Sequence, residues 1–144
     1  GIGLQSYNTP VDGIYAQAII NGSFQINQQA VSPYTSGTTP DNGDDTYLMD
    51  QWILLSDGDD IVDVSQETSV VPTGSPAAIK FEVETANKKF GIVQIIENAD
   101  AIKFAGKRVS LQFKAKTANA KVVKNLRAGL LAWKPGRPAE AGWE

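Results

Sequence analysis

The sequence predicts an all-β fold, a sandwich or barrel built from short antiparallel strands. Three observations support this prediction. Apolar and polar residues alternate over 78–84 and again over 107–116, as they do where side chains point in turn to a buried and a wet face of a strand. Turn residues recur about every ten positions, which is typical of sandwiches and barrels. No long segment has the apolar period of an amphipathic helix.

The early part of the chain predicts short elements between long turns. Asn21-Gly22 is a strong turn dipeptide, and residues 23–28 predict a short strand after it, with Phe24 and Ile26 on one face. Residues 30–46 are crowded with Ser, Thr, Pro, Gly, Asn and Asp, which predicts a long loop. The apolar segment 47–55 then predicts an element that becomes a strand at Trp52.

The later elements follow in quick succession. We predict strands at 61–67, 78–84, 90–96, 107–116 and 126–133, and one short helical turn within 98–104. The segment 107–116 has the clearest strand pattern of the chain. Val109, Leu111, Phe113 and Ala115 point to one face, and Arg108, Ser110, Gln112, Lys114 and Lys116 point to the other.

The domain organisation predicted from these elements is simple. Residues 1–17 are polar and weakly periodic, so we expect an extended N-terminal arm or linker. Residues 18–144 then form one β-sandwich domain, a length sufficient for a real core. The chain begins with Gly1 and stops at Glu144 soon after a predicted strand. We therefore expect a processed product or a piece of a longer polypeptide, with its last sheet edge covered by further residues or by a neighbouring chain.

Composition excludes several classes of chemistry. The chain has no Cys and no His, so it cannot form disulfides, thiolate zinc sites or Ser-His-Asp triads. No apolar run approaches the ~20 residues of a membrane-spanning helix, and we expect no membrane insertion. No signal peptide is visible at the N-terminus.

Charge is divided unevenly along the chain. Residues 1–79 contain ten Asp or Glu and no Lys or Arg, whereas residues 80–144 hold all 13 basic residues and six acidic ones. The halves are expected to attract each other, within one fold or between subunits, unless the acidic loops and basic strand faces are simply solvated. Because the basic residues alternate along strands and form no dense patch with stacking aromatics, we expect no nucleic-acid partner.

Four segments resemble, in order, motifs of carbohydrate-binding-like β-sandwich modules from bacteriophage tail fibres and related virion proteins. They are INGSFQINQ at 20–28, DQW at 50–52, VQIIE at 93–97 and FAGKRVSLQFKAK at 104–116. The resemblance implies a jelly-roll sandwich in a virion structural protein, often repeated or trimeric on a fibre. It also implies other virion subunits as partners and localisation in the virion. The family module continues for several strands past Trp133, which implies a sandwich left incomplete at the C-terminus.

Aromatic residues are the candidates for contact with a host-surface glycan, since an aromatic face packs well on a sugar ring. Tyr34 and Tyr47 flank the long polar loop, and Trp133 lies at the end of the last predicted strand. Trp52 and Trp133 have a second interpretation as core residues, because a Trp on a strand of a sandwich is usually buried.

Acidic clusters suggest two further sites. Asp57, Asp59 and Asp60 offer hard oxygen ligands of the kind calcium prefers, although they do not match the twelve-residue calcium loop. The alternative is an acidic turn in which Asp side chains bind their own backbone. Glu82 and Glu84 are close enough for a glycosidase pair, but they share a wet strand face beside Lys80, so we expect no catalytic residue.

The sequence therefore favours a non-enzymatic structural and recognition module of a tail fibre, a tail or a capsid appendage, with a host-surface glycan as a candidate ligand and no cofactor other than calcium. Two alternatives stay open. One is an accessory domain of a glycan-active enzyme, and the other is a purely architectural module between subunits.

Overall fold

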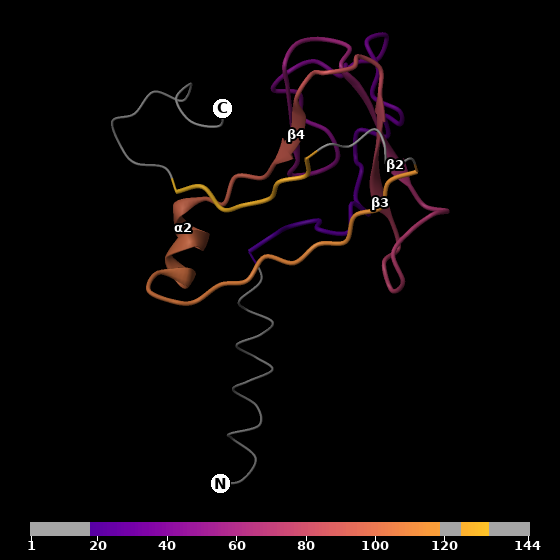
Figure 1. Cartoon of the computed structure of the whole chain (residues 1–144). Coiled ribbons are helices and arrows are strands. Elements are labelled where there is room, and N and C mark those ends of the chain that lie inside the picture. Colours follow the sequence, from indigo (N-terminus) through magenta and orange to yellow (C-terminus); the bar gives the residue numbers. More distant parts are fainter. Residues whose placement is uncertain (1–17, 119–124, 133–144) are drawn as a thin grey trace, which may run out of the picture. The chain divides into compact units, whose positions relative to one another are not determined.

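A computed structural model of the chain describes residues 18–118 and 125–132. Contacts divide the chain into two units, Gly1–Arg108 and Val109–Glu144. Within the described ranges, every strand and helical turn lies in the first unit (Figure 1). No helix in those ranges is long and apolar enough to cross a membrane. The arm predicted for residues 1–17 lies outside the described residues.

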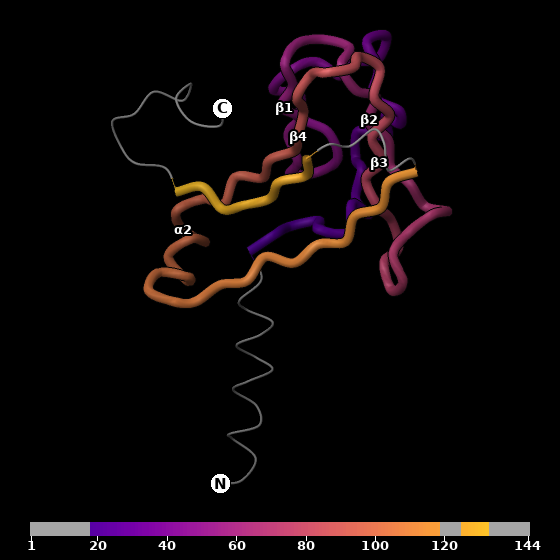
Figure 2. Tube along the Cα trace, in the orientation of Figure 1, coloured from indigo at the N-terminus to yellow at the C-terminus, as the bar shows by residue number. Residues whose placement is uncertain are grey.

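In the described residues, four short strands form two antiparallel sheets of two strands each, so the fold is all-β as predicted. Strand β1 (Ile53–Ser56) pairs with β4 (Phe90–Val93), and β2 (Val62–Glu67) pairs with β3 (Ala78–Val83) (Figure 2). The predicted helical turn is confirmed as α2 (Asn98–Ala101) followed by the 3-10 turn η1 (Ile102–Phe104).

The two sheets share one hydrophobic core. Val64 of β2 lies opposite Phe81 of β3, and the Phe81 ring lies 5.4 Å from the ring of Phe90 on β4. The fully buried members of the core are Tyr34, Leu48, Met49, Leu54, Val62 and Val64. Burial of each such side chain contributes about 1.5–3 kcal/mol relative to exposure, so these residues hold the two sheets together.

The strand predicted over residues 23–28 is not formed. The Asn21-Gly22 turn is present, but it continues through Phe24, whose backbone N–H donates to the Asn21 carbonyl at 3.0 Å and whose φ is 55°. A positive φ takes the backbone out of the extended region, so a strand cannot begin there. The Phe24 ring instead packs on Trp52, with ring centroids 5.1 Å apart.

The strands predicted over 107–116 and 126–133 were also wrong as far as the chain is described. Residues 108–117 and 125–132 have no strand partner among the described residues, and every residue in both segments is exposed. Alternation favours an extended segment with two faces, but a strand also needs a neighbouring backbone to receive its hydrogen bonds. That neighbour is missing from the described part of the chain.

Candidate functional site

The outer edge of β3 is open, and its backbone geometry follows from the pairing of β2. Val64 exchanges backbone hydrogen bonds with Tyr34, at 2.7 and 3.2 Å, so its N–H and C=O point away from β3. Antiparallel residues alternate in this direction along a strand. The backbone groups of Lys80 and Glu82 therefore face β2, and those of Phe81 and its neighbours two residues away face the open edge. No strand in the described ranges pairs with that edge.

The two faces of β3 differ sharply in chemistry. Ile79 and Phe81 pack against the core, and Val83 continues the same face but is 42% exposed. The opposite face of the β2–β3 sheet is acidic, since Asp63 and Glu67 of β2 lie beside Lys80 and Glu82 of β3, and these last two form a salt bridge at 3.0 Å. The edge thus combines unpaired backbone, an incompletely covered apolar face and an acidic outer face.

Strand β4 has a second open edge of a different kind. The Leu54 N–H donates to the Thr46 carbonyl, so Leu54 points its backbone away from β4, and by alternation Phe90 and Ile92 point theirs to the free side. The outer face of β4 is formed by Gly91, which has no side chain, and by the uncharged Val93. This edge is therefore shorter and electrically neutral.

The segment 107–118 presents a strand pattern without a strand partner in the described part of the chain. The chain enters it through a turn at Gly106, whose φ of 70° suits glycine. Its apolar side chains are open to solvent, with Phe113 58% and Val109 46% exposed. Residues 125–132 repeat the behaviour, with Leu131 81% exposed. Contiguous exposed apolar residues of this kind mark interaction surfaces.

The calcium site predicted at Asp57, Asp59 and Asp60 is not formed. The Asp57 Oδ2 atom accepts the Lys89 backbone N–H at 2.8 Å, and Asp60 Oδ1 accepts from the side chain of Asn42 at 3.3 Å. In the described residues, no three acidic side chains gather in a way that could hold a metal ion. These two carboxylates bind donors that are remote in sequence, the Lys89 backbone and the Asn42 side chain, and not the backbone of their own turn.

The buried amide of Asn42 joins two acidic loops, residues 41–45 and residues 57–60. Asn42 is fully buried, and its Nδ2 donates to the Val62 carbonyl at 3.2 Å and to Asp63 Oδ1 at 2.9 Å as well as to Asp60. Burial and the neighbouring carboxylate of Asp60 raise the pKa of Asp63, and the bond from Asn42 partly opposes them. The Asn42 Oδ1 has no partner in the described residues, so the Nδ2 contacts alone orient the amide.

The three predicted glycan contacts have different positions. Tyr34 is fully buried in the core, where its hydroxyl donates to Asn27 Oδ1 at 3.1 Å, so it cannot stack on a sugar. Burial, with a smaller effect of Asp50, raises the pKa of Tyr34 to about 12. Tyr47 is 60% exposed and is held by a backbone bridge to Ile53, which suits a surface contact. Trp133 lies outside the described residues.

Trp52 is half-buried. It belongs to a hydrogen-bond network that links two of the segments on which the resemblance rests, 20–28 and 50–52. The Trp52 indole N–H donates to the Asn21 carbonyl at 3.1 Å, and the Asn21 side chain donates to the Asp50 carbonyl at 3.1 Å. The Asp50 carboxylate accepts the backbone N–H of Gln28 at 2.8 Å. These polar residues hold the first turn against the approach to β1.

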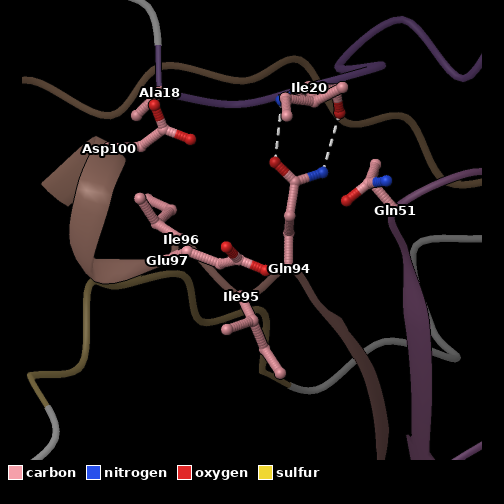
Figure 3. A pocket seen from close by; sticks show the side chains of 8 residues that line it. All are labelled: Ala18, Ile20, Gln51, Gln94, Ile95, Ile96, Glu97 and Asp100. Atoms are coloured by element: carbon pink, nitrogen blue, oxygen red, sulfur yellow. Dashed lines mark hydrogen bonds between the residues drawn. The ribbon is translucent and has the colours of Figure 1, made fainter.

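A polar cavity of about 240 Å³ lies between the segment at residue 20 and the chain after β4 (Figure 3). The Gln94 carboxamide reaches across it, accepting the Ile20 N–H and donating to the Ile20 carbonyl, both at 2.7 Å. Glu97 and Asp100 line the same cavity, and Asp100 binds Lys103 at 2.6 Å. The Gln94 side chain thus makes the two hydrogen bonds that a neighbouring strand would make with Ile20. It holds the backbone of Ile20 in place, which is a structural role.

Comparisons of the chain with family models, with curated proteins and with solved structures found no match.

The open β3 edge is the site that sequence reasoning missed. The sequence identified the two faces of 78–84, but it could not show that only one side of the strand is paired within the described ranges. A signal was present in Glu82 and Lys80, since charged residues are common on edge strands.

Proposed function

We propose that this chain is a non-enzymatic structural module of a phage virion, from a tail fibre, a tail or a capsid appendage, that works by assembling with other subunits. The observation that carries the proposal is the exposed apolar face of 107–118. An apolar strand face left in water is costly, and a partner that covers it recovers about 25 cal/mol for each Å² buried. A module of an assembly has such partners in place.

The resemblance to virion β-sandwich modules supplies the identity of the assembly. Three of its four motifs contain residues with organising contacts, namely Asn21, Asp50, Trp52 and Gln94. These contacts give the four residues structural roles. Such roles support a local architecture shared with the virion modules. In this proposal the jelly-roll topology is completed when further strands join the open edges of β3 and β4.

Host-surface glycan binding is the recognition part of the same proposal. It is supported by Tyr47, which is the exposed one of the two predicted aromatic contacts that the structure describes, at the end of the long polar loop over residues 30–46. An exposed ring on a fixed backbone can stack on a sugar without losing much conformational freedom.

Two measurements test the proposal. Light scattering across a range of protein concentrations should show an oligomer, and a glycan array should show binding that Tyr47→Ala weakens and the core-preserving Tyr34→Phe leaves intact. An oligomer that binds no glycan would favour the purely architectural module, for which the open edges are the specific support. A monomer at all concentrations that binds no glycan would overturn the proposal.

Release of reducing ends from glycans is the third readout, and it separates binding from catalysis. Absence of release is expected, and release by the purified chain would replace the proposal with the glycan-active enzyme.

A further inference from the structure

We propose that the segment 107–116 of one copy of this chain adds as a strand to the open edge of β3 in a second copy. The inference rests on the proposed assembly function, and it names the surface and the partner. Three properties support it: the backbone geometry of the edge suits a new strand, the apolar patterns of edge and segment match, and their charges are opposite.

The backbone of β3 is ready to accept another strand. Because Val64 bonds to Tyr34, the N–H and C=O groups of Ile79, Phe81 and Val83 point away from β2. They form a row at every second residue, which is the pattern a new antiparallel or parallel neighbour requires. Residues 108–117 are extended and have no strand partner in the described ranges, so they can supply the complementary row.

The apolar patterns match in period. Ile79, Phe81 and Val83 face the core side of β3, and Val83 is 42% exposed there. A strand added beside them places alternate residues on that same side. Val109, Leu111 and Phe113 recur at that spacing, so all three can extend the core over the half-covered rings of Phe81 and Phe90. Together with Phe81 and Phe90, these three residues would form one continuous apolar face shared by two copies.

Charge selects the β3 edge over the β4 edge. The outer face of the β2–β3 sheet carries Asp63, Glu67 and Glu82 against the single Lys80. The outer face of the segment carries Arg108, Lys114 and Lys116 and no acidic residue. Glu82 lies on the strand that would adjoin the segment, whereas Asp63 and Glu67 lie one strand further away, so the attraction is to the net negative charge of the whole face.

The β4 edge offers no such match. Its outer residues Gly91 and Val93 are uncharged, and the strand has four residues where β3 has six. A basic strand would gain less there in both hydrogen bonds and electrostatic attraction.

The division of the chain favours a second copy as the partner. The described residues from Val109 onward belong to a different compact unit of the chain from the one that contains β3. A strand that is outside its own chain's sheet unit is free to enter the same sheet of a neighbour, as in domain-swapped assemblies. Mutual exchange of the segment between two copies would close a two-fold dimer.

Disulfide trapping tests the contact directly, and the absence of native Cys makes each introduced pair unique. One copy carries Glu82→Cys on the outer face of β3, and a second carries Cys at Ser110, Gln112 or Lys114, three positions that allow for register. Mixing the two under mild oxidation should give a linked heterodimer. The control replaces Glu82→Cys by Ser36→Cys, which follows Tyr34 on the far side of β2 and should give little linkage.

Self-association provides a second readout that does not depend on register. Phe113→Ser should weaken association about tenfold or more, because it removes a ring from the shared core. Gln112→Ser is the matched control on the opposite face and should change association less than about threefold. Both side chains are exposed, so neither variant disturbs the folded core.

The outcomes separate this inference from the function on which it rests. A linked heterodimer together with the Phe113 effect supports the strand exchange. An oligomer that gives no linkage overturns the exchange and leaves the assembly function standing. An intrachain disulfide in the double variant Glu82→Cys/Gln112→Cys, with a monomeric mass, shows that the chain's own segment occupies the edge and also overturns the exchange. A monomer without any linkage overturns both.

Discussion

Strand β3 and the segment 109–114 have nearly the same sequence pattern, but β3 is paired and packed whereas the segment is exposed. AIKFEV and VSLQFK both alternate apolar and polar residues, and both place a Phe on the apolar side. In β3, Phe81 packs against the core and the backbone pairs with β2. In the segment, Phe113 is 58% exposed and the backbone has no strand partner in the described ranges. Alternation defines two faces, and pairing is a separate property.

The difference has a simple energetic basis. A strand is stabilised by hydrogen bonds to a neighbour and by burial of one face, and both need residues that are remote in sequence. β2 supplies them to β3, with the paired residues 11 to 21 positions apart in sequence. The segment 109–114 has the same capacity, and the described chain leaves it unused. The following predictions are ordered by the size of the expected effect.

The largest contrast should appear on truncating a leucine in each region. Leu54→Ala should lower the free energy of unfolding by about 2–5 kcal/mol, because Leu54 is fully buried. Leu111→Ala should change it by about 0.5 kcal/mol or less at concentrations where the chain is monomeric. Urea unfolding of both variants measures the two values. A cost for Leu111→Ala equal to that for Leu54→Ala in a monomer would mean that the segment is packed within its own chain.

A charge introduced at the buried Asn42 should show how much its hydrogen bonds contribute to stability. Asn42→Asp places a carboxylate where Nδ2 now donates to Asp60, Asp63 and the Val62 carbonyl, and should cost about 2–3 kcal/mol at pH 7. The cost should shrink toward pH 4, as the new carboxyl gains a proton. Exposed Asn87→Asp is the matched control and should be nearly neutral. A similar, pH-independent loss in both variants would contradict the role given to Asn42.

The smallest effect concerns the hydroxyl of Tyr34. Folding raises its pKa from 10.0 to about 12, so the folded chain keeps a proton that the unfolded chain loses. The stability linked to this proton is complete below pH 10 and is lost as the pH rises through about 12. Tyr34→Phe should cost about 1 kcal/mol at neutral pH through the lost bond to Asn27, and should make the melting temperature less sensitive to pH between 10 and 12.

Tyr47→Phe is the control for that measurement, because its ring is 60% exposed. It should leave both the neutral melting temperature and its alkaline decline close to those of the parent chain. Equal alkaline behaviour of the two variants would show that Tyr34 does not contribute the pH dependence.

Local patterns predicted much of the fold. The strands β2 and β3 match the predicted 61–67 and 78–84 closely, and the helical turn lies within 98–104 as expected. β1 begins one residue after the strand start predicted at Trp52, and β4 ends at Val93, before the predicted end at Ile96. At Gln94 the side chain, and not the backbone, pairs with Ile20. The strand predicted at 23–28 failed because Phe24 takes a positive φ within the turn, a conformation that the residue type disfavours.

The candidate sites were less predictable than the strands. Tyr34 and Tyr47 occupy similar positions at the two ends of one loop, yet the first is fully buried and the second is exposed. The backbone bridge from Tyr34 to Val64 draws the first ring into the core, and no local pattern contains that information. The same holds for Asp57 and Asp60, whose carboxylates bind Lys89 and Asn42 from other parts of the chain.

The sequence by itself determined the all-β class, the turn at Asn21-Gly22 and the two chemical faces of each alternating segment, because these depend on residues that are close along the chain. Only the tertiary structure decided which segments are paired, which edges stay open and which aromatic residues are buried. Those properties depend on backbone groups and side chains brought together from distant positions. β3 and the segment 109–114 therefore differ in partner although they agree in pattern.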